Sequence, residues 1–194
     1  MYEKLNITEN HLRLLSLFTN GGEYYIREVE RLIEISPRTA QLILYDLEAK
    51  GVLESETKGK IKVYRLMKSD VCKRYLVLAE QYKLIVFLEK KLVVKEIIRK
   101  ISPFIEGIGI VFGSYAKETE GKESDIDVFV AGDCKKAEIK KVSETYGIEI
   151  SVKCYPLKNF EKNFKNDTLL IEIQKNHIVF KGSERFVEVM LENG

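Results

Sequence analysis

The chain has no tryptophan and only two histidines, three cysteines and three prolines in 194 residues. Two histidines, His11 and His177, are too few for a histidine-based metal centre. The odd number of cysteines, without a Cys-x-x-Cys pair, argues against a zinc site and indicates a reducing compartment. We therefore expect a cytoplasmic protein whose chemistry uses other side chains.

Long apolar runs are also missing. No segment reaches the roughly 18 consecutive apolar residues that a membrane span requires, and the first six residues do not have the composition of a signal peptide. Hydrophobic residues make up 45% of the chain, which is enough for a buried core. We expect a folded, soluble protein without a membrane partner.

The net charge of +2 is small, but the charges are unevenly distributed. Residues 57–68 hold five basic residues and no acid, and residues 83–100 hold six basic residues and two acids. Residues 104–194 hold 13 basic and 16 acidic residues. The basic segments thus belong to the first half of the chain and the acidic excess to the second.

The most informative pattern lies in the acidic half. The apolar run Ile108–Phe112 leads into Gly113-Ser114, and ten residues later come Asp125 and Asp127, followed by another apolar run. Acids one residue apart in a strand share a face, where they repel each other unless a cation offsets their charge. Mg²⁺ favours such carboxylates together with substrate phosphates, and a Gly-Ser turn suits a phosphate. The alternative is a surface loop whose acids end an ordinary strand.

This pattern resembles the nucleotidyltransferase superfamily to which DNA polymerase beta belongs, and most closely its minimal prokaryotic or archaeal members. The resemblance covers residues 104–182. It implies a Mg²⁺ site with up to two ions, held by Asp125, Asp127 and a third acid on the next strand. In the segment 148–152 we expect that acid to be Glu149; the alternative is an exposed strand residue.

The same resemblance implies a nucleoside triphosphate substrate, most simply ATP. Gly113 and Ser114 would hold its β- and γ-phosphates. Lys117 stands where the family commonly has Arg or Lys and would contact the triphosphate, unless it is only a solvated loop lysine. Glu118 departs from the family, which often has glycine there. Small members include antitoxins that adenylylate a partner toxin, so a protein acceptor is one expectation.

The first 68 residues predict three helices and a basic hairpin, an order that resembles the winged helix-turn-helix family. Its third helix, which we expect to begin at Ser36-Pro37, would enter the major groove of double-stranded DNA. The expected contacts from this helix and the hairpin wing are Arg38, Thr39, Gln41, Tyr45, Lys58, Lys60 and Lys62. The alternatives are a winged helix used for protein contacts and a merely solvated hairpin.

A helix with apolar residues on several sides is predicted from Asp70 to about Lys100. One side would pack on the following domain, and another on a second copy of the chain as a homodimer. The alternative is a helix wholly buried in one monomer.

The expected architecture is α/β (α+β) and multi-domain. Residues 1–68 would form a winged helix, 69–102 a linker helix, and 103–194 a nucleotidyltransferase fold with a small mixed sheet. Two functions remain open. One is a Mg²⁺-dependent nucleotidyltransferase that carries a DNA-binding winged helix. The other is a DNA-binding regulator whose nucleotidyltransferase domain senses nucleotide or is catalytically silent.

Overall fold

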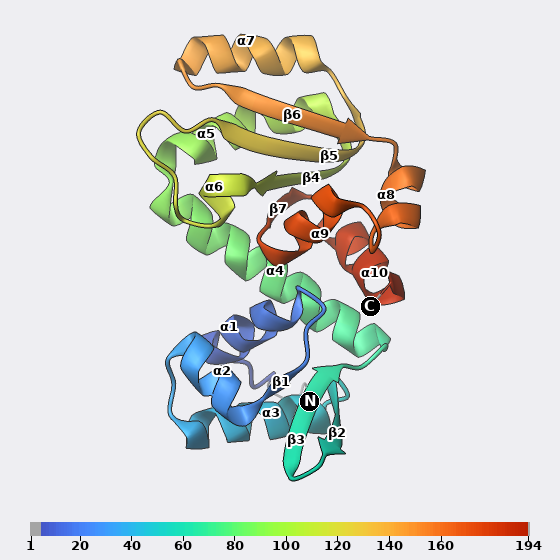
Figure 1. Ribbon diagram of the computed structural model, residues 1–194. Helices are drawn as coiled ribbons and strands as arrows, with labels where there is room; N and C mark the ends of the chain where they lie inside the picture. Colours follow the sequence, from blue (N-terminus) through green and yellow to red (C-terminus); the bar gives the residue numbers. More distant parts are fainter. Residues whose placement is uncertain (1–4, 194) are drawn as a thin grey trace. The chain divides into compact units, whose positions relative to one another are not determined.

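The computed structural model describes residues 5–193 and has an α+β architecture. The chain forms two compact units, one up to residue 79 and one from residue 80 to residue 193 (Figure 1). The second unit begins inside helix α4 (Asp70–Lys90), so this helix contributes to both. Among the described residues, no helix is long and apolar enough to cross a membrane.

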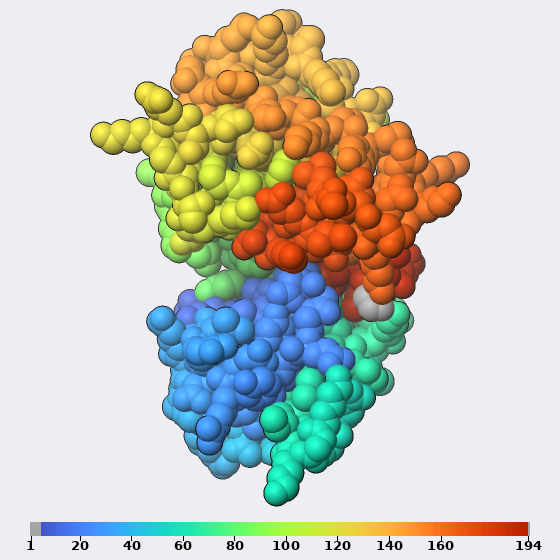
Figure 2. Space-filling model, in the orientation of Figure 1, coloured from blue at the N-terminus to red at the C-terminus, as the bar shows by residue number. Residues whose placement is uncertain are grey.

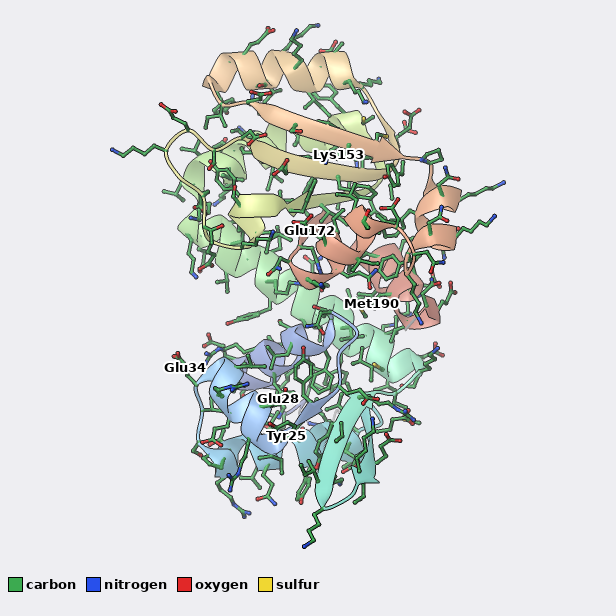
Figure 3. The ribbon with its side chains drawn as sticks, in the orientation of Figure 1. Tyr25, Glu28, Glu34, Lys153, Glu172 and Met190 are labelled. Carbon is green, nitrogen blue, oxygen red and sulfur yellow. The ribbon has the colours of Figure 1, made fainter. Side chains whose placement is uncertain are left out.

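Ahead of α4, the described part of the first unit, from residue 5 on, consists of three helices and a small antiparallel sheet. Its elements are α1 (Glu9–Phe18), β1 (Tyr24–Tyr25), α2 (Ile26–Ile33), α3 (Pro37–Ala49), β2 (Leu53–Lys58) and β3 (Ile61–Leu66). The sheet has the strand order β1-β3-β2, and β1 is a short addition to the predicted hairpin. Tyr25 and Glu28 lie where β1 passes into α2, and Glu28 Oε2 accepts a hydrogen bond from the Tyr25 backbone N–H (Figure 3).

Helix α3 begins and ends as the sequence predicts. Ser36 is its N-cap, and the Ser36 hydroxyl accepts a hydrogen bond from the Thr39 backbone N–H at 3.1 Å. Pro37 follows at the first helical position, where its missing N–H costs nothing. The buried residues of α3 are Ala40, Ile43, Leu44 and Leu47. One face of α3 therefore packs into the unit, and the opposite face is outward.

The second unit is built on a four-stranded mixed sheet with the order β6-β5-β4-β7. Strand β5 pairs antiparallel with β4 and parallel with β6, and β7 pairs antiparallel with β4. The elements are α5 (Leu92–Ile101), η1 (Ser102–Phe104), β4 (Ile105–Phe112), α6 (Gly113–Ala116), β5 (Ile126–Cys134), α7 (Lys136–Tyr146), β6 (Ile150–Tyr155), α8 (Leu157–Asn163), α9 (Thr168–Lys175), β7 (Ile178–Lys181) and α10 (Ser183–Asn193).

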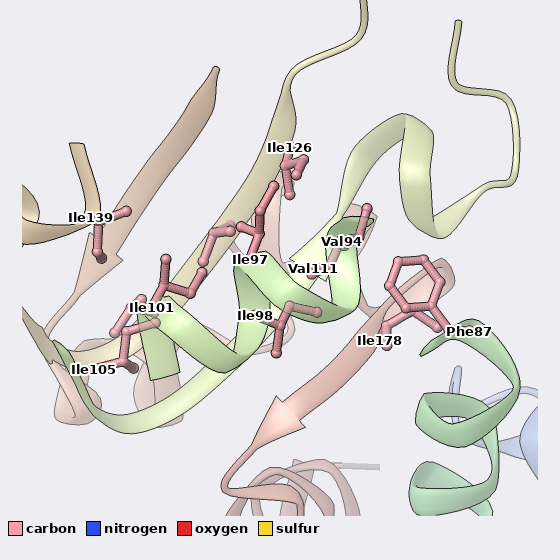
Figure 4. Close-up of a cluster of buried hydrophobic side chains, with 12 residues drawn as sticks. Phe87, Val94, Ile97, Ile98, Ile101, Ile105, Val111, Ile126, Ile139 and Ile178 are labelled. Carbon is pink, nitrogen blue, oxygen red and sulfur yellow. The ribbon is translucent and has the colours of Figure 1, made fainter. Parts of the chain in front are cut away.

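The two faces of this sheet have separate cores. On one face, α5 packs Ile97 and Ile101 against strand residues that include Ile126 (Figure 4). On the other face, the ring of Phe129 contacts those of Tyr155 and Phe160. Because residues alternate along β5, Ile126 and Val128 point to the first face, and Asp127 and Phe129 point to the second. Burial on both sides makes β5 a rigid support for the acids near its start.

Two predicted elements differ from the structure. The helix expected from residue 70 to about residue 100 is interrupted at Lys91, which has φ −121° and ψ 69° and separates α4 from α5. The strand expected at residues 148–152 begins only at Ile150. Gly147 ends α7 with φ +63°, and the carbonyl of Ile148 accepts a hydrogen bond from the Ser143 hydroxyl at 2.8 Å. Ile148 is therefore held by the helix before it.

Several apolar side chains of α4 are exposed, and three of them, Val71, Leu78 and Ile85, are spaced by seven residues. Seven-residue spacing places them along one side of the helix. The homodimer expected from the sequence through this helix stays a prediction.

Candidate active site and candidate nucleic-acid interface

The Gly-Ser turn follows directly from β4. Gly113 has φ +68°, a left-handed conformation that glycine adopts without strain. A Cβ atom at Gly113 would lie 2.1 Å from Asp127 Oδ2, so no larger residue fits unless the turn or the acid moves. The chain then makes the single turn of α6, which includes Ser114. The turn and the acid are thus in contact across the end of the sheet.

Asp125 and Asp127 flank the first residue of β5. Phe112, the last residue of β4, is the cross-strand partner of Asp127. Burial raises the pKa of Asp127, and the negative charge of Asp125 raises it further. The charge of Asp125 therefore acts on Asp127.

Glu149, the expected third acid, lies just outside β6. Its backbone carbonyl accepts a hydrogen bond from the Ile126 N–H at 2.8 Å, which places residue 149 alongside Asp125. The residue of β6 paired with Asp127 is Ser151. Among residues 5–193, no three His, Cys, Asp or Glu side chains are grouped so that they could hold a metal ion. The role of Glu149 as a metal ligand stays a prediction.

Lys117 lies at the C-terminus of α6 and is held by an acid from another helix. Its Nζ is 2.8 Å from Glu172 Oε1 in α9, and this contact lowers the pKa of Glu172. Helices α6 and α9 are neighbours on the surface of the second unit (Figure 2). The Lys117 ammonium is close enough to Asp127 to oppose the rise in the pKa of that acid.

Glu118, which departs from the family pattern, takes the backbone conformation that glycine prefers. Its φ is +55°, and its Oε1 lies 2.9 Å from the Nζ of Lys90. The glycine-like turn is therefore kept at the expense of some backbone strain. The Glu118 charge is paired with Lys90.

Sequence reasoning missed three polar residues around Asp127: Ser151, Lys153 and Glu172. Lys153 lies on β6 and Glu172 on α9 (Figure 3). Both charges act on Asp127, since Lys153 opposes the rise in its pKa and Glu172 adds to it. If the strand predicted at residues 148–152 is extended by one residue, side-chain alternation places Lys153 on the same face as Ser151. No signal in the neighbouring sequence indicates Glu172.

In the first unit, the predicted base-reading residues lie on the outward side of α3. Arg38 and Tyr45 are exposed, and Thr39 and Gln41 are partly exposed. Arg38 Nη1 donates to Gln41 Oε1 at 3.4 Å, and Gln41 Nε2 donates to the Tyr45 hydroxyl at 3.1 Å. Three of the four predicted residues thus form one hydrogen-bonded row along the helix.

Two of the three predicted lysines of the hairpin are paired with acids. Lys58 Nζ lies 2.9 Å from Glu56 Oε1 and also contacts Glu23, and Lys62 Nζ lies 2.7 Å from Glu48 Oε2. Among the described residues, Lys60 has no ion pair within 4.0 Å. The acids that reduce the positive charge of the hairpin come partly from outside it, so the sequence of residues 57–68 alone overstates this charge.

Comparisons with known proteins bear on the second unit. The family model of the nucleotidyltransferase domain matches residues 93–180, a little under half of the chain. No curated protein matches this chain. A solved structure of TrmBL2, described as an archaeal chromatin protein with a novel mode of DNA binding, covers 89% of this chain and 72% of its own length. Its sequence identity is 16% and its TM-score 0.31, values from which nothing follows for this chain. The chain thus contains a region similar to nucleotidyltransferase domains, and the Gly-Ser turn and the Asp pair both lie inside it.

Proposed function

We propose that this protein is a Mg²⁺-dependent nucleotidyltransferase that moves AMP from ATP to a protein or another acceptor. The observation that carries the proposal is the apposition of the Gly-Ser turn and the Asp pair, so close that a Cβ at Gly113 would lie 2.1 Å from Asp127 Oδ2. The match of residues 93–180 to the nucleotidyltransferase domain supports it.

The acids fit one Mg²⁺ ion that is shared with a substrate. Burial and the charge of Asp125 make ionisation of Asp127 unfavourable, and a cation relieves both effects. Mg²⁺ binds through one or two carboxylates plus substrate phosphates, so Asp125 and Asp127 are a sufficient protein contribution. When bound, the ion neutralises charge that develops on the phosphate oxygens.

The neighbouring groups would hold the triphosphate. In the Gly-Ser turn, backbone N–H groups and the Ser114 hydroxyl suit phosphate oxygens. Lys117 would exchange Glu172 for a phosphate, because both are anionic partners for the same ammonium. The acceptor oxygen then bonds to the α-phosphorus, the bond between the α-phosphorus and pyrophosphate breaks, pyrophosphate leaves, and the hydroxyl proton of the acceptor passes to water.

The test is incorporation of label from ATP labelled at the α-phosphate, with Mg²⁺ and a native lysate as the source of acceptors. We expect Asp127→Asn to abolish labelling, because the pair then loses half of its charge. The matched control is Asp133→Asn, which changes an exposed acid at the other end of the same strand. Labelling that persists undiminished in Asp127→Asn, with both variants folded by circular dichroism, refutes the proposal.

A regulator that senses nucleotide gives a different result. ATP would then bind the wild-type chain in equilibrium dialysis, but no α-label would become covalently attached to any molecule. ATP labelled at the γ-phosphate serves as the control for phosphoryl transfer, since adenylylation leaves the γ-phosphate in the released pyrophosphate.

A second candidate function, binding of double-stranded DNA, is favoured by the outward row Arg38–Gln41–Tyr45 and by the lysines of the hairpin. Arg and Gln are side chains that can pair bidentately with base edges, and lysines bind phosphates. A mobility shift of duplex DNA that weakens with salt and with Lys58→Ala/Lys60→Ala would support this function. No shift at low salt would contradict it, and the unit would then serve protein contacts.

A further inference from the structure

Strand β6 presents polar residues to the same face of the sheet as Asp127. In the parallel pairing of β5 with β6, Asp127 is opposite Ser151 and Phe129 is opposite Lys153. The ring contact between Phe129 and Tyr155, with centroids 5.2 Å apart, shows that these alternate residues share one face. Lys153 therefore belongs to the face that carries the candidate active site.

The Lys153 side chain reaches the end of the sheet where the Gly-Ser turn begins. Its Nζ lies 5.7 Å from the centroid of the Phe112 ring. Phe112 is the cross-strand partner of Asp127 and immediately precedes Gly113. The ammonium thus lies near both features that would hold a nucleotide, the acid pair and the turn.

Lys153 is also available to a ligand. It is exposed, and among the described residues no acid lies within 4.0 Å of its Nζ. Lys117, by contrast, is already paired with Glu172 at 2.8 Å. Of the two lysines whose charges reach Asp127, Lys153 is the one that can bind an anion without first losing a carboxylate partner.

Besides Asp125, the acid whose charge acts on Asp127 is Glu172, and Glu172 is paired with Lys117. Beside Asp127 on β6 stands the hydroxyl of Ser151, and Glu149 lies alongside Asp125, ahead of the strand. Within residues 5–193, no third His, Cys, Asp or Glu joins the Asp pair in a metal-binding group. Two carboxylates and a substrate suit a single Mg²⁺, which leaves part of the triphosphate charge to be balanced by other groups.

We propose that Lys153 binds the triphosphate, and that the site holds one divalent ion per nucleotide, with the Lys153 ammonium supplying charge that a second ion would otherwise supply. This inference rests on the proposed nucleotidyltransferase function. A lysine ammonium is a compact point charge and a common phosphate ligand.

The test uses the full chain with α,β-methylene-ATP, which cannot be cleaved between the α- and β-phosphates, and with Mn²⁺ as the ion. Calorimetry measures the nucleotide affinity, and electron paramagnetic resonance counts bound Mn²⁺. We expect one Mn²⁺ per bound nucleotide in the wild type. Lys153→Ala should weaken nucleotide binding about tenfold, the loss typical of one charge-assisted contact, and leave the Mn²⁺ count at one.

The matched control is Lys140→Ala, because Lys140 is exposed on α7, which packs on the other face of the sheet. Its affinity should equal that of the wild type, whereas Lys153→Arg should retain most of the affinity that Lys153→Ala loses. The affinity for inorganic tripolyphosphate should also fall from the wild type to Lys153→Ala, by the same factor as the affinity for the nucleotide, because the proposed contact is to phosphate.

Three results would overturn the inference while leaving the proposed function standing: two Mn²⁺ ions per nucleotide, equal affinities of the Lys153 and Lys140 variants, or unchanged tripolyphosphate binding by Lys153→Ala. A wild-type chain that binds no nucleotide under any condition refutes both.

Discussion

Among single residues, Gly113 is the one most tightly constrained by its contact with Asp127, which decides what can stand at position 113. Glycine is required there for two separate reasons, a left-handed φ of +68° and the absence of space for a Cβ. The first belongs to the local turn. The second follows only from the register that places Asp127 opposite Phe112.

Gly113→Ala should therefore lower stability and also abolish α-label incorporation. The left-handed conformation alone destabilises an alanine by about 1 kcal/mol. In addition, the new Cβ atom would clash with Asp127 Oδ2 and displace either the acid or the turn. The matched control is Gly147→Ala, at φ +63° with no atom within 4 Å of the built Cβ. Urea unfolding of both variants separates the two costs. Equal destabilisation with equal labelling would contradict the role of the close contact.

The residues of the site were predictable to different degrees. Asp125 and Asp127 are identified by their spacing from Gly113. Strand alternation then predicts that the two side chains share one face, without any information from the rest of the fold. The family resemblance, together with the alternating pattern of residues 148–152, predicts Glu149 as the third acid, yet the strand begins at Ile150. Glu172 could not be predicted, since it approaches Lys117 across 55 positions of the sequence.

At the scale of elements, the hairpin β2–β3 shows why local charge is a poor guide to the field around a strand. The sequence of residues 57–68 contains only basic charges, but the structure pairs Lys58 with Glu23 and Glu56 and Lys62 with Glu48. Two of these acids lie in earlier parts of the chain. Any phosphate that binds the hairpin must compete with them.

Glu56→Gln should therefore strengthen binding to duplex DNA, if the first unit binds DNA, because Lys58 loses one competing carboxylate. We expect a gain of about two- to threefold in affinity at low salt and a steeper salt dependence. Fluorescence anisotropy with labelled duplex, repeated over a range of salt concentrations, measures both.

Glu138→Gln provides the control for net charge, since Glu138 pairs with Lys141 on α7 of the other unit. Its affinity should stay at the wild-type value. If both variants bind DNA equally well, the gain comes from net charge alone and the hairpin has no special part in it.

Helix boundaries show the same division between local and tertiary causes. Ser36-Pro37 predicts the start of α3 because the cap and the proline act within one turn. The interruption between α4 and α5 at Lys91 has no Pro or Gly to mark it. Lys91 pairs with Glu120 from the loop after α6, a contact that no pattern within the helix indicates.

At the scale of the whole molecule, an ionised group inside the second unit links global stability to pH. Glu80 is fully buried, and its Oε1 lies 2.9 Å from Lys83 Nζ and 3.1 Å from His177 Nε2. Burial acts to raise the pKa of Glu80, but the charges of Lys83 and His177 outweigh it and hold the pKa at about 2. The Nδ1 of His177 lies 2.9 Å from the carbonyl oxygen of Ile173, which fixes the ring.

Glu80 should therefore stabilise the fold above its ordinary pKa of 4.5, and this contribution should disappear as the pH falls from 4.5 to about 2. Glu80→Gln should lose about 3 kcal/mol at pH 7, because a buried charge loses its partner. On acidification from pH 4.5 to about 2, the free energy of unfolding of Glu80→Gln should then fall less than that of the wild type. Urea unfolding at a series of pH values measures the difference.

Glu96→Gln is the surface control, since Glu96 is partly exposed and pairs with Arg99 on the same helix. A solvent-screened surface pair contributes little, so the free energy of unfolding of Glu96→Gln should stay far closer to that of the wild type across the window than that of Glu80→Gln does. Parallel curves for Glu80→Gln and the wild type would contradict the assigned role of Glu80.

The order of residues is enough to predict the secondary structure of both units in outline, the capped start of α3, and a Gly-Ser turn followed by an Asp pair. These features depend on side-chain periodicity and on contacts between residues a few positions apart. Both can be inferred directly from the sequence. The three-dimensional fold was needed to show that Lys153 and Ser151 share a face with Asp127, that Glu172 pairs with Lys117, and that Glu80 contacts His177. Strand register and helix docking bring these residues together, and both are set by packing of the whole core.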